Sequence, residues 1–205
     1  MDAERLGIPH AGGLGMLVAQ ARRSAEQFCG HAIPDEQVEI IMSTIYRQME
    51  NIVLIGMPGC GKSTVGRTLA DATGRPFIDA DSEIENLAGM SIPDIFASQG
   101  EPGFRAWETK VLAELGKCSG AVIATGGGCI TRPENYPLLH QNAVIIWIKR
   151  ALDALPSDGR PLSQQNSAQT LYEQRREKYA AFADITVDNN GAISETLSKI
   201  MEALQ

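Results

Sequence analysis

Apolar runs and helical stretches alternate along the chain from residue 51 onward. Runs with the composition of buried strands occupy residues 51–55, 76–79, 121–124, 143–148 and 185–187. Helices are expected between them, over residues 63–72, 82–87, 92–99, 103–116 and 168–182. Apolar strands that alternate with helices are typical of a parallel sheet covered on both faces. The pattern therefore predicts an α/β domain, in which ligands gather at the carboxyl ends of the strands.

The first 47 residues do not follow this alternation. A helix is expected from Gly12 to about Phe28, and a second one begins at Pro34 with apolar residues along one side. The plain interpretation is a two-helix extension that packs on the main domain, and an extension that does not dock is the alternative. The predicted organisation is thus a helical extension, residues 1–47, followed by an α/β domain, residues 48–205.

Composition and charge narrow the classes of partner. The 205-residue chain carries a net charge of −7, which argues against binding to the phosphate backbone of nucleic acids. No apolar run approaches the roughly 20 residues that a membrane helix needs, and the acidic start is unlike a secretory signal. The four cysteines show no CxxC pair and no zinc spacing. We expect a monomeric, cytoplasmic protein with reduced thiols and with no nucleic acid or membrane partner.

The segment Gly56-Met57-Pro58-Gly59-Cys60-Gly61-Lys62-Ser63 fits the phosphate-loop pattern G-x-x-x-x-G-K-[ST], between a predicted strand and a predicted helix. Such a loop turns its N–H groups toward a phosphate, where the helix N-terminus adds favourable charge. Lys62 would reach the terminal phosphates of ATP, and the Ser63 hydroxyl would ligate Mg²⁺. The predicted nucleotide-binding residues here are Gly59, Cys60, Gly61, Lys62, Ser63 and Thr64. Because the Cys60 thiol lies near a helix N-terminus, we expect its alkylation to inactivate the protein and ATP to slow the reaction. A glycine-rich turn with a chance lysine is the alternative, which the strand–loop–helix order disfavours.

Two aspartates, Asp79 and Asp81, follow the second predicted strand. On an extended backbone, residues two apart point to the same side. Beside a triphosphate, one carboxylate would hold the water shell of the metal and the other would engage an acceptor hydroxyl. The alternative is a capping turn in which Asp81 begins the following helix. The spacing alone does not choose between these two interpretations.

A triple glycine, Gly126-Gly127-Gly128, follows the third predicted strand. Three glycines let main-chain N–H groups approach a ligand closely, and this conformational freedom is costly in a plain connection. The sequence therefore favours a ligand-binding loop, with a loop without function as the alternative.

Three arginines, Arg105, Arg160 and Arg175, are candidates for binding an anion. A guanidinium group such as that of Arg105 or Arg175 can pair with a carboxylate through two parallel hydrogen bonds. Taken alone, each is better explained as a solvated surface arginine. Arg160 lies in a polar stretch with glycine and proline that suits a mobile lid, from which it would neutralise charge on a transferring phosphoryl group.

Taken together, these segments resemble shikimate kinase from about residue 49 to the C-terminus. The resemblance rests on the phosphate loop, residues 77–81, 92–96, Gly100-Glu101, Gly103-Phe104-Arg105, Glu108, residues 125–128, Arg160-Pro161-Leu162, Arg175 with Tyr179, and Ala183-Asp184. Many folds share the phosphate loop, whereas the other elements in this order are far more specific. The resemblance implies a three-layer α/β/α P-loop kinase fold with a five-stranded parallel sheet.

The same resemblance implies ATP-dependent phosphorylation of the 3-hydroxyl of shikimate, on the chorismate route to aromatic amino acids, with Mg²⁺ as cofactor. In this reaction Ser63 would ligate the metal, Asp79 would hold it through water, and Asp81 would bind the ring hydroxyls and assist deprotonation. The implied catalytic residues are Lys62, Asp81 and Arg160. The implied substrate-binding residues are Asp81, Arg105, Gly126, Gly127, Gly128 and Arg175, and Arg160 would also contact the nucleotide.

The chain departs from this family in the segment 151–159, which is short. It lacks the arginine that family members often stack on adenine, and Pro156 stands roughly in its place. Ser163 replaces a usual second leucine. The base preference of the nucleotide site is therefore open, whereas the transfer chemistry is not affected.

The N-terminal segment has a resemblance of its own. Residues 13–21, Gly30 and residues 33–35 are similar to the C-terminal tail of shikimate dehydrogenase, and Gln20 matches a glutamine that touches shikimate in that family. Because the rest of such an enzyme is missing here, we infer a remnant of a fused dehydrogenase–kinase without dehydrogenase activity.

Two other functions stay open on the sequence. One is a P-loop kinase with a different polyol acid acceptor, such as gluconate. The other is a module that binds nucleotide or shikimate, or docks on a dehydrogenase, without turnover.

Overall fold

The computed structural model describes residues 13–155 and 165–204, and the chain forms two compact units, Met1–Glu50 and Asn51–Gln205. The first unit contains helices α2 (Leu14–Cys29) and α3 (Asp35–Met49). Helix α2 ends where Gly30 takes up a left-handed conformation (φ 71°) and its N–H bonds the Glu26 carbonyl.

One arginine ties the two helices of this unit together. The Arg22 guanidinium contacts the carboxylates of Glu26, at 3.0 Å, and Asp35, and it also donates to the Ile33 carbonyl at 2.6 Å. Neither α2 nor α3 contains a buried residue. The connection is therefore held by polar contacts rather than by a core of its own.

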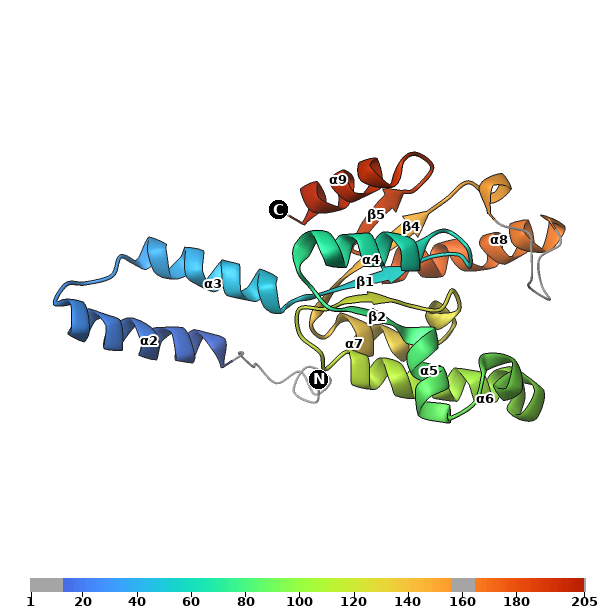
Figure 1. Cartoon of the computed structure of the whole chain (residues 1–205), viewed down its shortest axis with the longest axis horizontal. Helices are drawn as coiled ribbons and strands as arrows, with labels where there is room; N and C mark the ends of the chain where they lie inside the picture. Colours follow the sequence, from blue (N-terminus) through green and yellow to red (C-terminus); the bar gives the residue numbers. More distant parts are fainter. Residues whose placement is uncertain (1–12, 156–164, 205) are drawn as a thin grey trace. The chain divides into compact units, whose positions relative to one another are not determined.

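The second unit is built on a five-stranded sheet in which every neighbouring pair of strands is parallel. Its strands are β1 (Asn51–Ile55), β2 (Phe77–Asp79), β3 (Val122–Ala124), β4 (Ala143–Lys149) and β5 (Ile185–Asp188). They are arranged in the order β2-β3-β1-β4-β5. This arrangement confirms the predicted parallel sheet and places β1, with the loop that follows it, at the centre (Figure 1).

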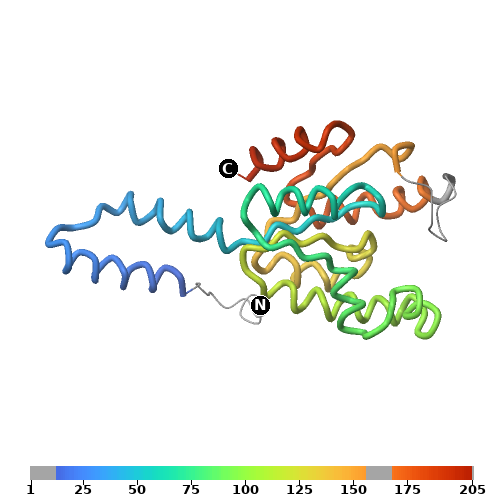
Figure 2. The backbone as a smooth tube through the Cα atoms, in the orientation of Figure 1, coloured from blue at the N-terminus to red at the C-terminus, as the bar shows by residue number. Residues whose placement is uncertain are grey.

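Helices cover both faces of the sheet, as the three-layer prediction requires (Figures 1 and 2). Helices α4 (Lys62–Thr73) and α9 (Ile193–Ala203) contact each other and lie on one face. Helices α6 (Ile92–Leu115), α7 (Asn135–His140) and α8 (Gln165–Phe182) lie on the other, and α5 (Ala80–Ala88) packs on α6. Short 3₁₀ turns, η1 (Cys129–Thr131) and η2 (Leu152–Ala154), follow β3 and β4.

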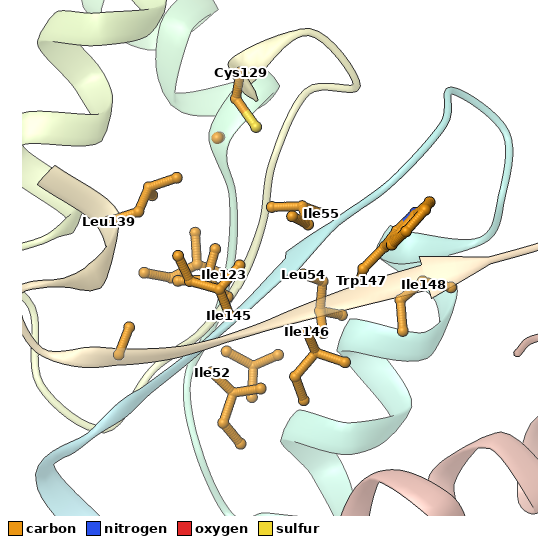
Figure 3. Packing of buried hydrophobic residues seen from close by; sticks show 14 of the residues in the cluster. Ile52, Leu54, Ile55, Ile123, Cys129, Leu139, Ile145, Ile146, Trp147 and Ile148 are labelled. Carbon is orange, nitrogen blue, oxygen red and sulfur yellow. The ribbon is translucent and has the colours of Figure 1, made fainter. Parts of the chain in front are cut away.

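The central strands are buried on both sides. All five residues of β1 are buried, and along β4 successive side chains point to opposite faces (Figure 3). Ile145 and Trp147 point to one face of the sheet, and Ile146 and Ile148 point to the other. This double burial explains why β4 reads as an uninterrupted apolar run rather than as an alternating one.

Helix α6 is broken where the sequence predicts two separate helices. Gly100 has a non-helical backbone (φ 68°, ψ −174°), and Pro102 follows it. The indole N–H of Trp107 donates to the Gln99 side chain at 3.1 Å and so bridges the break. The second half of α6 begins with the segment that carries Arg105 and Glu108.

The sequence analysis missed α7 and α9. Helix α7 has only six residues, which is too short for a periodic signal. Helix α9 did carry a signal, because Leu197 and Ile200 follow Ile193 at helical spacing. Within the described residues, no helix is both long and apolar enough to cross a membrane.

Candidate active site

The phosphate loop leaves the carboxyl end of β1 and enters α4 at Lys62. All three of its glycines adopt conformations that other residues avoid, with φ of 146° at Gly56, 82° at Gly59 and 100° at Gly61. A Cβ atom on Gly56 would lie 2.4 Å from the Ile148 carbonyl oxygen, so the loop passes directly against β4. The motif glycines are therefore required by the path of the backbone.

The Lys62 side chain lies inside this loop. Its ammonium group donates to the carbonyls of Gly56, at 3.0 Å, and Met57, at 3.1 Å, and the residue is only 8% exposed. Its positive charge is thus already placed among the main-chain groups of the loop, where phosphate oxygens would enter.

Cys60 is less accessible than the sequence indicates. It is fully buried, and its Sγ atom lies 4.0 Å from the Lys62 ammonium. Alkylation of Cys60 therefore requires the loop to open, and the exposed Cys29 is the more accessible thiol.

Asn189, which the sequence analysis missed, contacts the phosphate loop from the connection between β5 and α9. Its amide group donates to the Cys60 carbonyl at 2.8 Å, and its side-chain oxygen accepts a bond from Thr196 on α9 at 2.9 Å. The side chain thus connects the phosphate loop to the C-terminal end of the fold. No local motif marks this residue, because the contact spans 129 positions.

Asp79 joins the phosphate loop to the second strand. The Ser63 hydroxyl donates to Asp79 Oδ2 at 2.8 Å, so the two predicted metal-binding residues lie side by side. The other carboxylate oxygen of Asp79 accepts the Asp81 N–H at 3.1 Å and caps α5. The idea that Asp81 is the capping residue is therefore wrong, because the extended backbone ends at Asp79 and Asp81 already lies in the first turn of the helix.

The triple glycine lies between the remaining candidates. A Cβ atom on Gly126 would lie 2.8 Å from Asp81 Oδ1 and 3.1 Å from Glu108 Oε1. The segment therefore passes so close to these carboxylates that no larger residue fits without displacing them.

The next two glycines make equally close approaches. A Cβ on Gly127 would lie 2.6 Å from Cδ of Pro58 in the phosphate loop, and a Cβ on Gly128 would lie 2.3 Å from both terminal nitrogens of Arg105. The triple glycine thus touches the phosphate loop on one side and a substrate-binding candidate on the other.

Arg105 is held by two carboxylates of its own helix. Its Nη1 atom lies 2.8 Å from Glu108 Oε2, while Nε and Nη2 lie 3.3 and 3.1 Å from Glu101 Oε1. Glu108 is almost completely buried, whereas the Glu101 side chain is 65% exposed. The fork formed by Nε and Nη2 is therefore occupied by the more mobile of the two partners.

Burial is the main influence on the pKa values of Glu108 and Cys129. Burial raises the pKa of Glu108, and the nearby Arg105 and Arg175 oppose that rise, while the Asp81 charge adds to it. Burial likewise raises the pKa of Cys129 to about 12, so its thiol stays protonated. Of the described residues, no three His, Cys, Asp or Glu side chains form a metal-binding group.

Arg175 reaches the same loop from α8. Its Nη1 donates to the Gly127 carbonyl at 3.0 Å, and the Tyr179 hydroxyl donates to the same oxygen at 2.5 Å. Asp81 of α5, Arg105 of α6 and Arg175 of α8 therefore converge around the triple glycine, residues 126–128, after β3. Arg160, together with Pro156 and Ser163, lies outside the described residues.

Comparison with known proteins matches residues 58–205 to the family model of shikimate kinase. The chain is 42% identical to the shikimate kinase of Synechococcus elongatus over 164 residues, which are 75% of this chain and 86% of that protein. It is 39% identical to the shikimate kinase of Halorhodospira halophila over 170 residues, which are 78% of this chain and 96% of that protein.

The solved structures include a shikimate kinase from Acinetobacter baumannii in complex with shikimate. It aligns with a TM-score of 0.72 at 37% identity, and the alignment covers 79% of this chain and 96% of the other. The matches therefore extend across nearly the full length of these relatives, and the family match lies within the α/β unit.

Proposed function

We propose that this chain, which belongs to the shikimate kinase family, transfers the terminal phosphoryl group of ATP to the 3-hydroxyl group of shikimate. The observation that carries this proposal is the position of the triple glycine. It contacts Pro58 of the phosphate loop, the carboxylate of Asp81 and the guanidinium of Arg105. An acceptor held against these glycines would lie next to the phosphate chain.

On the nucleotide side, Lys62 is the principal cation. It binds two loop carbonyls in the described structure, and phosphate oxygens offer a stronger, charge-assisted partner for the same ammonium group. The loop N–H groups from Gly59 to Thr64 would complete the cradle. Arg160 would add positive charge from the segment before α8, so its removal should slow transfer more than it weakens binding.

The residues Ser63 and Asp79 fit a magnesium ion. A hydroxyl and a carboxylate 2.8 Å apart are hard oxygen donors, and Mg²⁺ typically takes few protein ligands and keeps waters and substrate phosphates. When bound, the ion would neutralise charge between the phosphates. Ser63 would ligate it directly, and Asp79 would hold it through water while still capping α5.

On the acceptor side, Asp81 would take the proton of the 3-hydroxyl group as that hydroxyl oxygen bonds to the terminal phosphorus and the bond between this phosphorus and ADP breaks. Arg105 and Arg175 would pair with the carboxylate of shikimate, since a guanidinium fixes both the charge and the orientation of such a group. Glu108 would hold Arg105 in place because their ion pair is buried, and the substrate carboxylate would displace the exposed Glu101 from the Nε and Nη2 fork.

A coupled ADP-release assay tests the reaction. Shikimate, gluconate and a blank without acceptor should be compared at saturating ATP, and turnover is expected only with shikimate. Turnover with gluconate would indicate a different polyol acid kinase. ADP release at the same rate with and without an acceptor, or no ADP release at all, would contradict the kinase assignment.

Two substitutions test the assigned roles. Asp81→Asn and Arg105→Ala are expected to lose most turnover while ATP binding, measured by calorimetry, persists. Both substitutions change residues assigned to the acceptor, so loss of ATP binding in either variant would mean that the roles are misassigned.

The helical unit is assigned an evolutionary origin different from that of the α/β unit. We propose that α2 and α3 derive from the C-terminal tail of a shikimate dehydrogenase, with Gln20 exposed on α2. The chain should therefore show no NADP-linked oxidation of shikimate, and measurable oxidation would refute this proposal.

A further inference from the structure

The Gly127 carbonyl oxygen accepts two hydrogen bonds from one helix. Arg175 Nη1 and the Tyr179 hydroxyl, four residues apart on α8, both donate to it. Residues at this spacing lie on the same face of a helix, so both side chains approach the loop together. One of these two donors is assigned to the substrate under the proposed function, and the other has no assigned role.

The two donors differ in their freedom to move. Tyr179 is fully buried, and its ring stacks on Trp147 of β4 with 5.4 Å between ring centroids. Burial raises the pKa of Tyr179 far above the usual range, so its hydroxyl stays a proton donor. Arg175 is only half-buried and has a longer, more flexible side chain. Tyr179 is therefore the fixed donor and Arg175 the exchangeable one.

The orientation of the Gly127 carbonyl matters for the acceptor site. In a trans peptide the carbonyl and the following N–H point in opposite directions. Fixing the Gly127 carbonyl toward α8 thus aims the Gly128 N–H away from that helix, and Gly128 lies against the Arg105 guanidinium. Loss of the carbonyl contact would allow this peptide to rotate and change the surface that the acceptor meets.

We infer that Tyr179 is a positioning residue for the phosphoryl acceptor, which keeps the Gly127 carbonyl bonded when Arg175 leaves it to pair with a substrate carboxylate. This inference rests on the proposed function of Arg175. Without the tyrosine hydroxyl, release of Arg175 would leave a part-buried carbonyl without a partner, and binding of the substrate would carry that cost. With the hydroxyl present, Arg175 exchanges one partner for another.

A double-mutant cycle on the full chain tests the exchange, with shikimate affinity measured by calorimetry and KM by the coupled assay. Tyr179→Phe removes one oxygen and keeps the ring on Trp147. It is expected to weaken shikimate binding about tenfold, with the KM for ATP within about twofold of the parent value. In an Arg175→Ala background the same change should have little effect on shikimate binding, because the carbonyl is then unbonded in both states.

Tyr172→Phe serves as the matched control. It removes the same atom from the same helix, and the Tyr172 hydroxyl has no hydrogen-bond partner among the described residues. Its shikimate affinity should equal that of the parent.

Three results would overturn the inference. They are an unchanged shikimate affinity in Tyr179→Phe, equal losses with and without Arg175, and a loss shared by shikimate and ATP. A purely structural role of Tyr179 predicts the last two. Should Arg175→Ala alone leave shikimate affinity unchanged, the carboxylate role of Arg175 would fail, which is a separate result. Melting temperatures of all variants identify any general loss of stability.

Discussion

Arg105 and Glu108 form a buried ion pair one turn apart on α6, with 2.8 Å between Nη1 and Oε2. The Glu108 side chain is 1% exposed and the Arg105 side chain 11%. The other carboxylate oxygen of Glu108 has no hydrogen-bond partner among the described residues and faces Gly126. A buried pair of this kind is weak support for stability by itself. It fixes one edge of the guanidinium, while the other edge is held only by the exposed Glu101.

The stability of the protein should therefore depend on pH through Glu108. Its folded pKa is raised, chiefly by burial, so the folded state binds the proton more tightly than the unfolded chain. This contribution is present below the ordinary carboxyl value of 4.5 and is lost as pH rises through the folded pKa. Relative to Glu108→Gln, the parent should thus lose unfolding free energy as pH rises above 4.5, as measured by urea unfolding. If the unfolding free energy of the parent relative to Glu108→Gln instead increases with pH, attraction to Arg105 outweighs the effect of burial.

The phosphate loop and the strands could be predicted because their signals are local. Gly56 to Ser63 needs one sequence pattern, and β1 and β4 need only uninterrupted apolar runs. Asn189 and Tyr179 could not be found this way, since they act on backbone carbonyls 129 and 52 positions away. Tertiary packing brings such residues to the site, and the sequence contains no spacing that indicates these long-range contacts.

Asp79, the last residue of β2, and Asp81 show a different limit of prediction from sequence. Asp79 and Asp81 are both good N-cap residues, and the sequence does not show where the strand ends. The strand ends at Asp79, so this residue caps α5 and also accepts the Ser63 hydroxyl. One side chain therefore serves both the helix and the proposed metal site.

This double role of Asp79 can be separated by two substitutions. Asp79→Asn keeps an oxygen for the cap but removes the charge, so the Mg²⁺ concentration for half-maximal activity should rise about 10–100-fold with little change in stability. Asp79→Ala should in addition lower the unfolding free energy by about 1 kcal/mol, because the cap is lost. Metal titrations of activity and urea unfolding measure the two effects. An unchanged Mg²⁺ requirement in Asp79→Asn would contradict the metal assignment.

Adjacent glycines in the triple-glycine segment should affect different substrates. In Gly128→Ala the new methyl group displaces the Arg105 guanidinium, and in Gly127→Ala it meets the ring of Pro58 in the phosphate loop. Gly128→Ala should raise the KM for shikimate, and Gly127→Ala should raise the KM for ATP, each by about a hundredfold at most. Gly13→Ala is the control, since no atom of the described residues lies within 4 Å of its Cβ position. Equal effects of both loop variants on both substrates would instead indicate a general collapse of the loop.

Glu101 should act as an internal competitor of the substrate carboxylate. It occupies the Nε and Nη2 edge of Arg105, the edge that a carboxylate would engage through two parallel bonds. Because Glu101 is largely exposed, its ion pair is weak, and Glu101→Gln should lower the KM for shikimate by about two- to fivefold. Glu114→Gln, which removes an equally exposed partner of Lys117 from the same helix, should leave this KM unchanged. Steady-state kinetics at saturating ATP distinguish the variants. If the KM of Glu101→Gln rises instead, Glu101 orients Arg105 for the substrate, and the carboxylate enters along the other edge of the guanidinium.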